Sequence, residues 1–520
     1  MLRTRHVLAL AALLFLWNAW AYDLWAPDEP YFGEGAREMV VDGQWAVPHV
    51  NGAVTTDKPP LFFWLIAIAS LPFHRVTSLT ARLPSALAMI AAAALTMRLA
   101  RRFAGERAGP VAGLVFVTTY LVWDKGRSAQ IDALLCVLVL AAVSAFEAYR
   151  AGDLGGRRAG LLFWASAALA TLAKGPVGFL LPLGIALVTL ALDRNLRSWR
   201  AFAPASGPVL FLGLVGAWMA LATIGGHGTY SVWGAFEKHV LERAVHGMHH
   251  KQPFWYYAKV LPVQLVPWTM MLPAAILAAW RRRDPGDRFL LAWAAFVVVF
   301  FSVPVEKRDL YVLPAYPAFA ILVARTLEAP LLRRLATAPH AVWAAAMILV
   351  GLAAPVIVPR EGYLTTIRAV IPSIAVVLTG ATALWACWKG RLEGAIKATA
   401  LGTATAYVLT ATLVFPALNG IKSARTFAGH LAAATAESRA AGHDVVAYDV
   451  GNLPEALAFY SGGVYTRVLA EPGALAAHLG QPARVFAVVN EEALEGLPAM
   501  PVVLERTELA GHHVALVANR

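Results

Sequence analysis

Apolar residues fall in long runs along most of the chain, and short polar or basic stretches separate these runs. A transmembrane helix needs about 20 mainly apolar residues to cross ~30 Å of hydrocarbon. With a window of that length, the pattern predicts about thirteen spans and therefore a polytopic α-helical membrane protein. The predicted spans are residues 7–25, 80–100, 109–123, 129–149, 159–173, 175–192, 205–224, 257–279, 288–303, 309–327, 340–358, 369–388 and 395–416.

The first run admits a second interpretation. Arg3 and Arg5, an apolar stretch and the tripeptide Ala19-Trp20-Ala21 together imitate a secretory signal with its cleavage site. The bulky aromatic residues around that tripeptide favour instead an aromatic belt at the membrane surface. In either case the segment that follows emerges on the outer side. Within that segment, residues 61–73 form a short apolar piece that is expected to lie on the membrane surface.

Basic clusters follow the even-numbered spans and test the number of spans. If the N-terminus is cytoplasmic, every cluster falls on the inner side, as the positive-inside rule requires. One span missed in the middle would put the later clusters outside. The odd number of spans then carries the C-terminal segment outward. The clusters are Arg98/Arg101/Arg102/Arg107, Arg157/Arg158, Arg194/Arg197/Arg200, Arg281/Arg282/Arg283, Arg333/Arg334 and Lys389/Arg391/Lys397.

The pattern changes after Pro416, where short strand-like and helix-like stretches alternate. Residues 444–449, 464–469 and 484–489 are predicted strands with helices between them. We therefore expect a membrane domain over residues 1–416, with outer loops at 26–79 and 225–256. Residues 417–520 are expected to form an accessory α/β domain on the outer face, large enough to fold alone.

Composition supports the membrane class and excludes a soluble protein. Of the 520 residues, 59% are hydrophobic and 15% are charged, whereas soluble domains carry about a quarter charged residues. The formal charge of +12 does not indicate a nucleic-acid partner, because most of it lies in the clusters between apolar runs. Cys136 and Cys387 each lie inside an apolar run and form no disulfide framework.

The predicted outer loops are rich in basic residues, although the positive-inside rule should leave outer loops poor in lysine and arginine. Lysine and arginine bind phosphate through charge-assisted hydrogen bonds, so the set indicates an anionic ligand at the outer membrane surface. Attraction to lipid headgroups is the alternative for any one of them. The outer basic residues are Arg37, Lys58, Lys125, Arg127, Lys174, Lys251, Lys307 and Arg308.

Carboxylates crowd into the stretch that follows the first span. Asp28 and Glu29 lie at its outer end, where a carboxylate can act as a general base, orient an acceptor or help to hold a metal. An acidic start to a surface helix is the compatible structural interpretation. Apolar residues at helical spacing support that helix, and Glu34 and Glu38 are expected to face water.

Two further outer stretches carry candidate ligands. Asp57 and Lys58 lie side by side before two prolines, which stiffen the backbone. The loop at 225–256 contains several histidines, including His250, and neutral imidazole is a good ligand for a divalent cation. No spacing typical of a structural zinc site occurs.

Four motifs, in this order, resemble the bacterial aminoarabinose transferases of lipid A and, more broadly, the protein O-mannosyltransferase-like GT-C superfamily. They are PDEPYFGEGAREM, TDKPPLFFW, HKQPFWYY and KRDLYVLPAYP. The resemblance covers essentially the whole chain. It implies a polytopic glycosyltransferase that takes a sugar from a polyprenyl phosphate on the outer leaflet.

The resemblance also implies roles for individual residues. Asp28 matches the essential acidic residue, with Glu29 beside it, and Asp132 matches a second functionally sensitive aspartate. Asp57 and His250 match a pair that can hold a divalent metal (Zn, Mg or Mn). The chain departs from the family at Asp57, where the family has glutamate, and at residues 30–32, where it has Thr-Arg-Tyr. The candidate donor-phosphate ligands are Lys58, Lys174 and Tyr311, to which we add Lys307, Arg308 and Tyr31.

We therefore expect an inverting glycosyltransferase of the bacterial inner membrane. Its N-terminus is expected in the cytoplasm and its C-terminal domain in the periplasm. The donor is a polyprenyl-phosphate sugar, and the acceptor is a cell-envelope lipid such as lipid A or another glycan. Transfer to Ser or Thr of a secreted protein is the alternative within the enzyme class. A flippase for lipid-linked sugars ranks lower, because its charges belong near the bilayer midplane rather than at helix ends.

Overall fold

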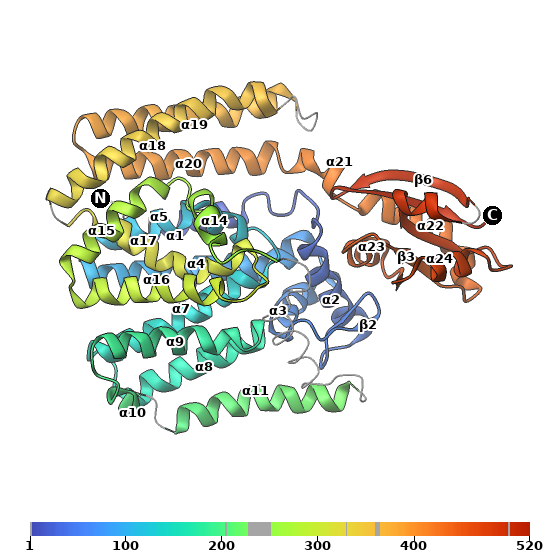
Figure 1. The fold of residues 1–520 in the computed structure, drawn as a ribbon, viewed down its shortest axis with the longest axis horizontal. Helices are drawn as coiled ribbons and strands as arrows, with labels where there is room; N and C mark the ends of the chain where they lie inside the picture. The colour runs from blue at the N-terminus through green and yellow to red at the C-terminus, as the bar shows by residue number, and fades with distance from the viewer. Residues whose placement is uncertain (1–2, 203–204, 227–250, 329, 359–364, 498–499) are drawn as a thin grey trace. The chain divides into compact units, whose positions relative to one another are not determined.

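The structure is a computed structural model that describes residues 3–202, 205–226, 251–328, 330–358, 365–497 and 500–520 (Figure 1). The chain divides into two compact units. The helical unit comprises Met1–Ala19, Thr56–Phe62 and Arg82–Val414. The mixed unit comprises Trp20–Thr55, Phe63–Ala81 and Phe415–Arg520. The C-terminal segment is thus grouped with two earlier stretches of the chain.

Helices make up the helical unit, and most of them overlap the predicted spans. They are α1 (Thr4–Leu16), α4 (Ser78–Ala104), α5 (Ala108–Thr118), α6 (Tyr120–Gly126), α7 (Ile131–Arg150), α8 (Gly156–Lys174), α9 (Val177–Leu192), α10 (Ser198–Phe202), α11 (Ser206–Gly225), α14 (Tyr256–Gln264), η3 (Thr269–Met271), α15 (Leu272–Arg282), α16 (Pro285–Ser302), η4 (Asp309–Ala315), α17 (Tyr316–Arg325), α18 (Pro330–Ile357), α19 (Thr366–Trp388) and α20 (Leu392–Leu413).

The structure supports a polytopic membrane protein but does not confirm thirteen spans. Among the described residues, seven helices are long and apolar enough to cross a membrane, or eight if one bent pair counts as a span. That pair replaces the predicted span 257–279, because the chain bends by 118° between α14 and the helices that follow. Other predicted spans, such as those containing α1, α5 and α9, form apolar helices of only 10–17 residues.

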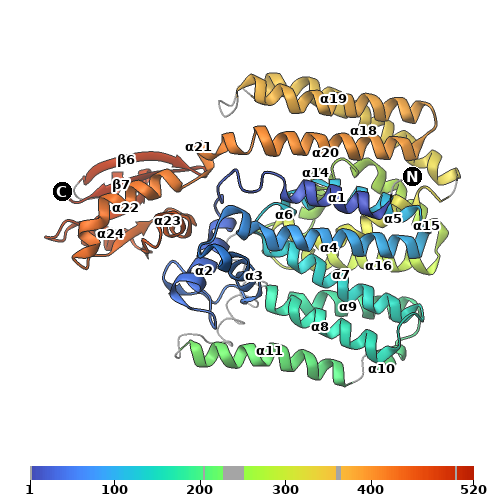
Figure 2. The same cartoon turned by 180° about the vertical axis from the view of Figure 1, so that it is seen from behind.

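Close helix packing holds the unit together. Helix α18 runs along α19, and α19 runs along α20, as both views show (Figures 1 and 2). Glycines allow the close approach: a Cβ atom at Gly380 would lie 2.5 Å from the carbonyl oxygen of Ala344. Small residues at such crossings are typical of helix pairs in membranes, where hydrophobic burial no longer drives association.

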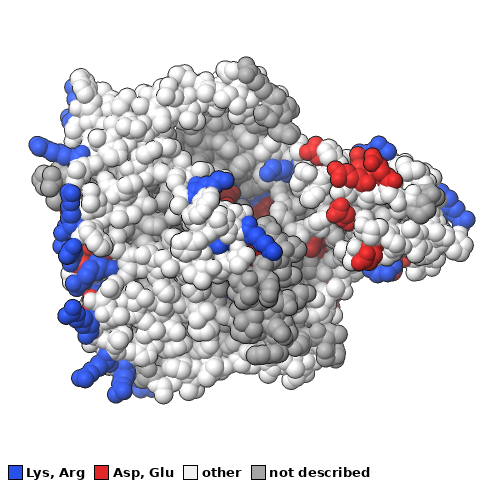
Figure 3. Space-filling view, viewed as in Figure 1, with Lys and Arg blue, Asp and Glu red and all other residues white. Residues whose placement is uncertain are grey.

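The basic clusters gather at one end of the helical unit. Figure 3 shows Lys and Arg side chains along the end where α10, α15 and the N-terminus lie. Ion pairs join helix ends there: Arg150 Nη1 is 2.7 Å from Asp193 Oδ2, and Arg288 Nη2 is 3.4 Å from Asp193 Oδ1. The clusters therefore share one side of this unit, as the sequence predicts.

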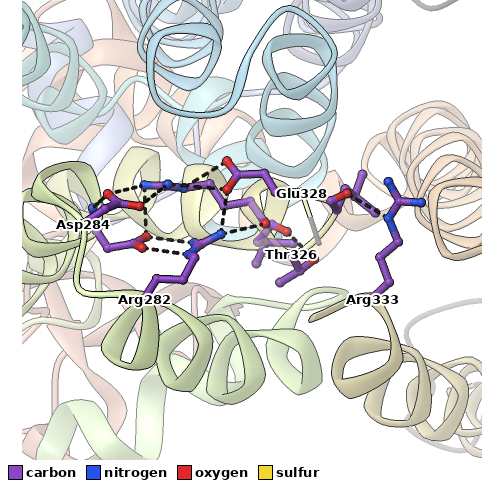
Figure 4. Close-up of polar contacts among 9 residues, drawn as sticks. Arg282, Asp284, Thr326, Glu328 and Arg333 are labelled. Carbon is purple, nitrogen blue, oxygen red and sulfur yellow. Dashed lines mark hydrogen bonds and ion pairs between the residues drawn. The ribbon is translucent and has the colours of Figure 1, made fainter. Parts of the chain in front are cut away.

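A charge network at the same end ties α15, α16 and α17 together (Figure 4). Arg282 pairs with Asp287 at 2.8 Å and with Glu328 at 2.7 Å. Arg325 pairs with Asp284 at 2.7 Å and with Asp287 at 3.0 Å. Arg325 and Asp287 are buried, so their charges need these partners to offset desolvation.

The mixed unit combines short helices with a five-stranded sheet of order β4-β3-β5-β7-β6. Strands β4, β3 and β5 are parallel, whereas β7 and β6 add an antiparallel edge. The elements, with α3 starting in the helical unit, are α2 (Asp28–Asp42), β1 (His49–Val50), β2 (Ala53–Val54), α3 (Leu61–Ser70), η1 (Leu71–Phe73), η6 (Pro416–Leu418), α21 (Asn419–Lys422), α22 (Arg425–Ala440), β3 (Val445–Tyr448), α23 (Leu453–Ser461), β4 (Thr466–Leu469), α24 (Pro472–Leu479), β5 (Phe486–Asn490), η7 (Glu491–Gly496), β6 (Val502–Leu509) and β7 (His512–Ala518).

The predicted C-terminal α/β architecture is confirmed. The three predicted strands correspond to β3, β4 and β5, with α23 and α24 between them. The strands β3 and β5 are buried almost throughout, as central parallel strands are. The β6–β7 hairpin is an addition that the sequence pattern does not predict.

Candidate functional site

Asp132, Lys174 and Tyr311, three of the predicted site residues, come from three different elements and meet in the helical unit. Asp132 lies in the first turn of α7, and Lys174 is the last residue of α8. These positions suit their charges, because a helix favours anions at its N-terminus and cations at its C-terminus. The Lys174 ammonium donates to Asp132 Oδ1 and lies 4.4 Å from the centre of the Tyr311 ring.

Two more predicted cations belong to the same group. Lys58 and Arg308 both lie close enough to act electrostatically on Lys174. Lys58 Nζ donates to Asp57 Oδ2 over 2.6 Å, and both side chains are partly exposed. We call Lys58, Lys174, Arg308 and Tyr311 the cation cluster. Each of its lysines is held by a carboxylate, so an arriving anion meets ammonium groups that are already positioned.

Lys307, which the sequence also predicts as a ligand of the donor phosphate, directs its ammonium at backbone carbonyl groups. Its ammonium donates to the carbonyl oxygens of Gln252 (2.9 Å) and Pro304, and its side chain is buried. Burial lowers the pKa of Lys307. The neighbouring backbone is paired as well, since Gln252 N–H donates to Val305 O over 3.1 Å. Lys307 therefore joins two of the recognised motifs, 250–257 and 307–317, to each other.

Sequence reasoning missed Gln264, which supports the same segment. Its side-chain nitrogen donates to the carbonyl oxygen of Asp309 (2.9 Å), and its oxygen accepts from Tyr316 (2.8 Å). Gln264 is buried, and Tyr257 donates to the carbonyl of Arg308 over 2.9 Å. The sequence does contain a signal for this role, since Gln264 is a lone amide inside an apolar run. A buried polar group needs hydrogen-bond partners, so such a residue is expected to bind polar groups of another segment.

Only one member of the predicted metal pair, Asp57, lies among the described residues. His250 lies outside them, and they hold no group of three His, Cys, Asp or Glu side chains that fits a metal ion. Asp57 instead has the Lys58 ammonium as a close partner. A metal at Asp57 therefore stays a prediction.

The remaining predicted residues belong to the mixed unit. Asp28 is the first residue of α2 and is partly exposed. Glu29 is buried and accepts the backbone N–H of Trp25 over 3.0 Å, so it shapes the turn that leads into the helix. Tyr31 shares a 2.9 Å hydrogen bond with Thr55, two residues before Asp57 in the sequence.

The helix predicted after Asp28 is confirmed, but the prediction that Glu34 and Glu38 face water is wrong. Their exposed fractions are 0% and 2%. Glu34 accepts two 2.8 Å hydrogen bonds from Arg37, and Glu38 accepts the N–H of Gly52 over 3.0 Å. Helix α2 packs against α23 and β1, so its polar face is covered by protein. Burial raises the pKa of Glu38 to about 8, and the neighbouring Glu34 adds to the shift.

We expect Glu38→Gln to stabilise the protein in a pH-dependent manner. The folded state keeps a proton on Glu38 that the unfolded chain loses above about pH 4.5, so stability falls as pH rises from about 4.5 to about 8. Glutamine stays neutral and keeps an acceptor for Gly52. The Tm of the variant should therefore match the wild type near the acid end of that window and exceed it near pH 8. Thermal unfolding of purified protein measures this, with the exposed Glu437→Gln as control. Parallel Tm profiles for wild type and Glu38→Gln would contradict the burial argument.

Comparison with solved structures shows the fold, which the chain shares with an archaeal oligosaccharyltransferase and with ArnT. The archaeal oligosaccharyltransferase AglB from Archaeoglobus fulgidus, solved with an inhibitory peptide and a dolichol-phosphate, matches with a TM-score of 0.53 at 13% identity. The match covers 89% of this chain and 64% of AglB. ArnT from Cupriavidus metallidurans, bound to undecaprenyl phosphate, matches with a TM-score of 0.79 at 20% identity. That match covers 99% of this chain and 98% of ArnT, and it shows a common fold.

Sequence relatives agree with the resemblance of the motifs. The family described as dolichyl-phosphate-mannose-protein mannosyltransferase matches residues 57–220. The undecaprenyl phosphate-α-4-amino-4-deoxy-L-arabinose arabinosyl transferase of Edwardsiella ictaluri is 31% identical over 306 residues, which are 58% of this chain and 55% of the relative. The transferase of Aeromonas salmonicida is also 31% identical, with the same coverage. The chain thus spans about half the length of the relatives that it matches. The predicted likeness to aminoarabinose transferases is confirmed.

Proposed function

We propose that this protein is an inverting integral-membrane glycosyltransferase. It moves a sugar, aminoarabinose or a related pentose or hexose, from a polyprenyl-phosphate donor to a cell-envelope acceptor such as lipid A. The observation that carries this proposal is the contact of Lys174 with Asp132 and the Tyr311 ring, with Lys58 and Arg308 close enough to act electrostatically on Lys174. The activity for which the sequence relatives are named supports the choice of donor.

The cation cluster is suited to stabilise the leaving group. When the glycosidic bond breaks, the lipid phosphate gains negative charge, and preorganised cations lower the energy of that state. Lys174 is held between the Asp132 carboxylate and the Tyr311 ring, so its ammonium does not have to be ordered during the reaction. Asp132 then acts by positioning Lys174. As negative charge develops on the lipid phosphate, the phosphate and the Asp132 carboxylate both interact with the Lys174 ammonium.

Asp28 serves the acceptor in this proposal. The acceptor attacks the anomeric carbon from the face opposite the phosphate, which gives inversion. A hydroxyl acceptor needs Asp28 as a general base, whereas a phosphate acceptor is already anionic and needs Asp28 for orientation. Glu29 is assigned to shaping the turn before Asp28, because it already accepts the Trp25 N–H.

The proposed location is the bacterial inner membrane, with the cation cluster at the outer side. Helix α7 carries Asp132 at one end and Arg150 at the other, and its 20 residues span about 30 Å. Arg150 belongs to the basic end, so the positive-inside rule puts that end and the N-terminus in the cytoplasm. The C-terminal segment then lies in the periplasm.

Transfer to a protein hydroxyl is the second candidate, because the matching family is described as protein mannosyltransferases. An acceptor panel separates the two. Purified protein in lipid nanodiscs receives a labelled undecaprenyl-phosphate sugar with either lipid A or Ser/Thr-rich peptides. Label on lipid A supports the first proposal, and label on peptide alone supports the second. Wild-type activity that is lost in chelator and restored by one added divalent ion would support the predicted metal.

A further inference from the structure

The C-terminal part of the mixed unit holds the backbone just before α2. The N–H of Leu24 donates to the Tyr460 hydroxyl over 2.6 Å, and that hydroxyl donates to the carbonyl of Leu24 over 3.1 Å. One side chain of α23 thus satisfies both backbone groups of a residue four positions before Asp28. Burial raises the pKa of Tyr460, so the hydroxyl stays protonated and keeps both hydrogen bonds.

Residues around Tyr460 strengthen the same attachment. Asp23 accepts hydrogen bonds from Arg425 Nη2 (2.6 Å) and from the Ser423 hydroxyl (2.6 Å). The Arg425 guanidinium lies 4.9 Å from the centre of the Tyr460 ring. Asn419 accepts the N–H of Asp23 and the indole N–H of Trp25, each over 3.1 Å. Side chains from 419–460 therefore bind polar groups of each of the residues 23–25.

The other end of α2 is attached as well. Arg37 donates to the Tyr465 hydroxyl over 3.0 Å, and that hydroxyl donates to Asp42 over 3.1 Å. Asn51 pairs with both backbone groups of Thr466, over 2.7 Å and 2.9 Å. These contacts leave α2 little freedom to rotate or slide on the sheet domain.

The fit along the helix is close. A Cβ atom at Gly33 would lie 2.7 Å from Leu24 and 3.2 Å from the Phe459 ring. A larger residue there would require the Leu24 and Phe459 side chains to move. The packing and both sets of hydrogen bonds therefore fix the register of α2, and with it the position of its first residue, Asp28.

We propose that the C-terminal α/β domain positions the helix that carries Asp28, and that Tyr460 is its main positioning residue. This inference rests on the proposed function of Asp28. The domain is then more than an accessory, because it sets the placement of the acceptor-side carboxylate. A change at Tyr460 should lower the rate of the chemical step and leave donor binding by the cation cluster intact.

Tyr460→Phe tests this role, because it keeps the ring and removes both hydrogen bonds to Leu24. We expect kcat to fall by about 10- to 100-fold, the size of effect that a small misplacement of a reacting group produces. The KM for the donor should stay within about twofold of wild type. Tyr448→Phe is the matched control, since Tyr448 packs on the opposite face of the same sheet. It should keep wild-type kcat.

Hydrogen exchange supplies a readout that does not need turnover. In Tyr460→Phe, the amides of residues 22–31 should exchange faster than in wild type, while those of β3 and β5 stay protected. Unchanged exchange, or wild-type kcat in Tyr460→Phe, would overturn the inference. An equal loss of kcat in Tyr448→Phe would also overturn it, since the effect would then be general. If the wild type transfers no sugar, the proposed function fails, and the exchange data still decide whether Tyr460 holds this segment.

Discussion

Asp28→Asn is expected to reduce kcat by about 100- to 10,000-fold with a hydroxyl acceptor, the range that a general base contributes. Asparagine keeps the size of the side chain and its place at the start of α2, but it cannot take a proton. The KM for the donor should change little, because the cation cluster stays intact. Initial rates of release of polyprenyl phosphate measure both parameters.

The acceptor decides how this result is interpreted. With a phosphate acceptor, Asp28→Asn should lose less activity, because the nucleophile is already ionised. Asp444→Asn, an exposed aspartate paired with Arg467 in the same unit, should retain wild-type rates. Full turnover by Asp28→Asn with every acceptor would remove Asp28 from the mechanism.

Lys174→Met should lower kcat/KM for the donor by about 100- to 1,000-fold, comparable to the loss of one preorganised donor at an anionic transition state. Methionine keeps much of the side-chain length and removes the charge over the Tyr311 ring. The variant also leaves the buried Asp132 without its partner, which is destabilising by itself. Activity and Tm should therefore both fall.

A second substitution separates the two effects of Lys174→Met. The double variant Lys174→Met/Asp132→Asn removes both charges, so its Tm should recover while its kcat/KM stays low. Lys397→Met is the control, since Lys397 pairs with Glu393 at 2.7 Å in the same unit. Recovery of activity in the double variant would show that Lys174 serves stability alone.

Much of the candidate site could be predicted from charge placement. Lys58, Lys174 and Arg308 stand out in the sequence because they fall in predicted outer segments, which the positive-inside rule leaves poor in basic residues. The motif resemblance adds Tyr311, and the structure brings these four residues together. The α2 helix and the three central strands follow from local hydrophobic periodicity, which is strong where one face is buried.

Other features depend on tertiary contacts that local patterns do not contain. Glu34 and Glu38 look like the solvated face of a helix, yet α23 and the chain around Gly52 cover them. Lys307 carries the charge expected of a phosphate ligand, but its ammonium is used by nearby carbonyl groups. The number of spans is hard to predict because several apolar runs form short or sharply bent helices.

The most direct test of the proposed function follows the donor. Purified protein in nanodiscs is given a labelled undecaprenyl-phosphate aminoarabinose together with lipid A, and free undecaprenyl phosphate and modified lipid A are both quantified. We predict that the two products appear in equal amounts, and that Lys174→Met and Asp28→Asn strongly reduce both. Absence of any free polyprenyl phosphate across a panel of donors and acceptors, while proteoliposomes still move the labelled donor between leaflets, would contradict the account and indicate a transporter.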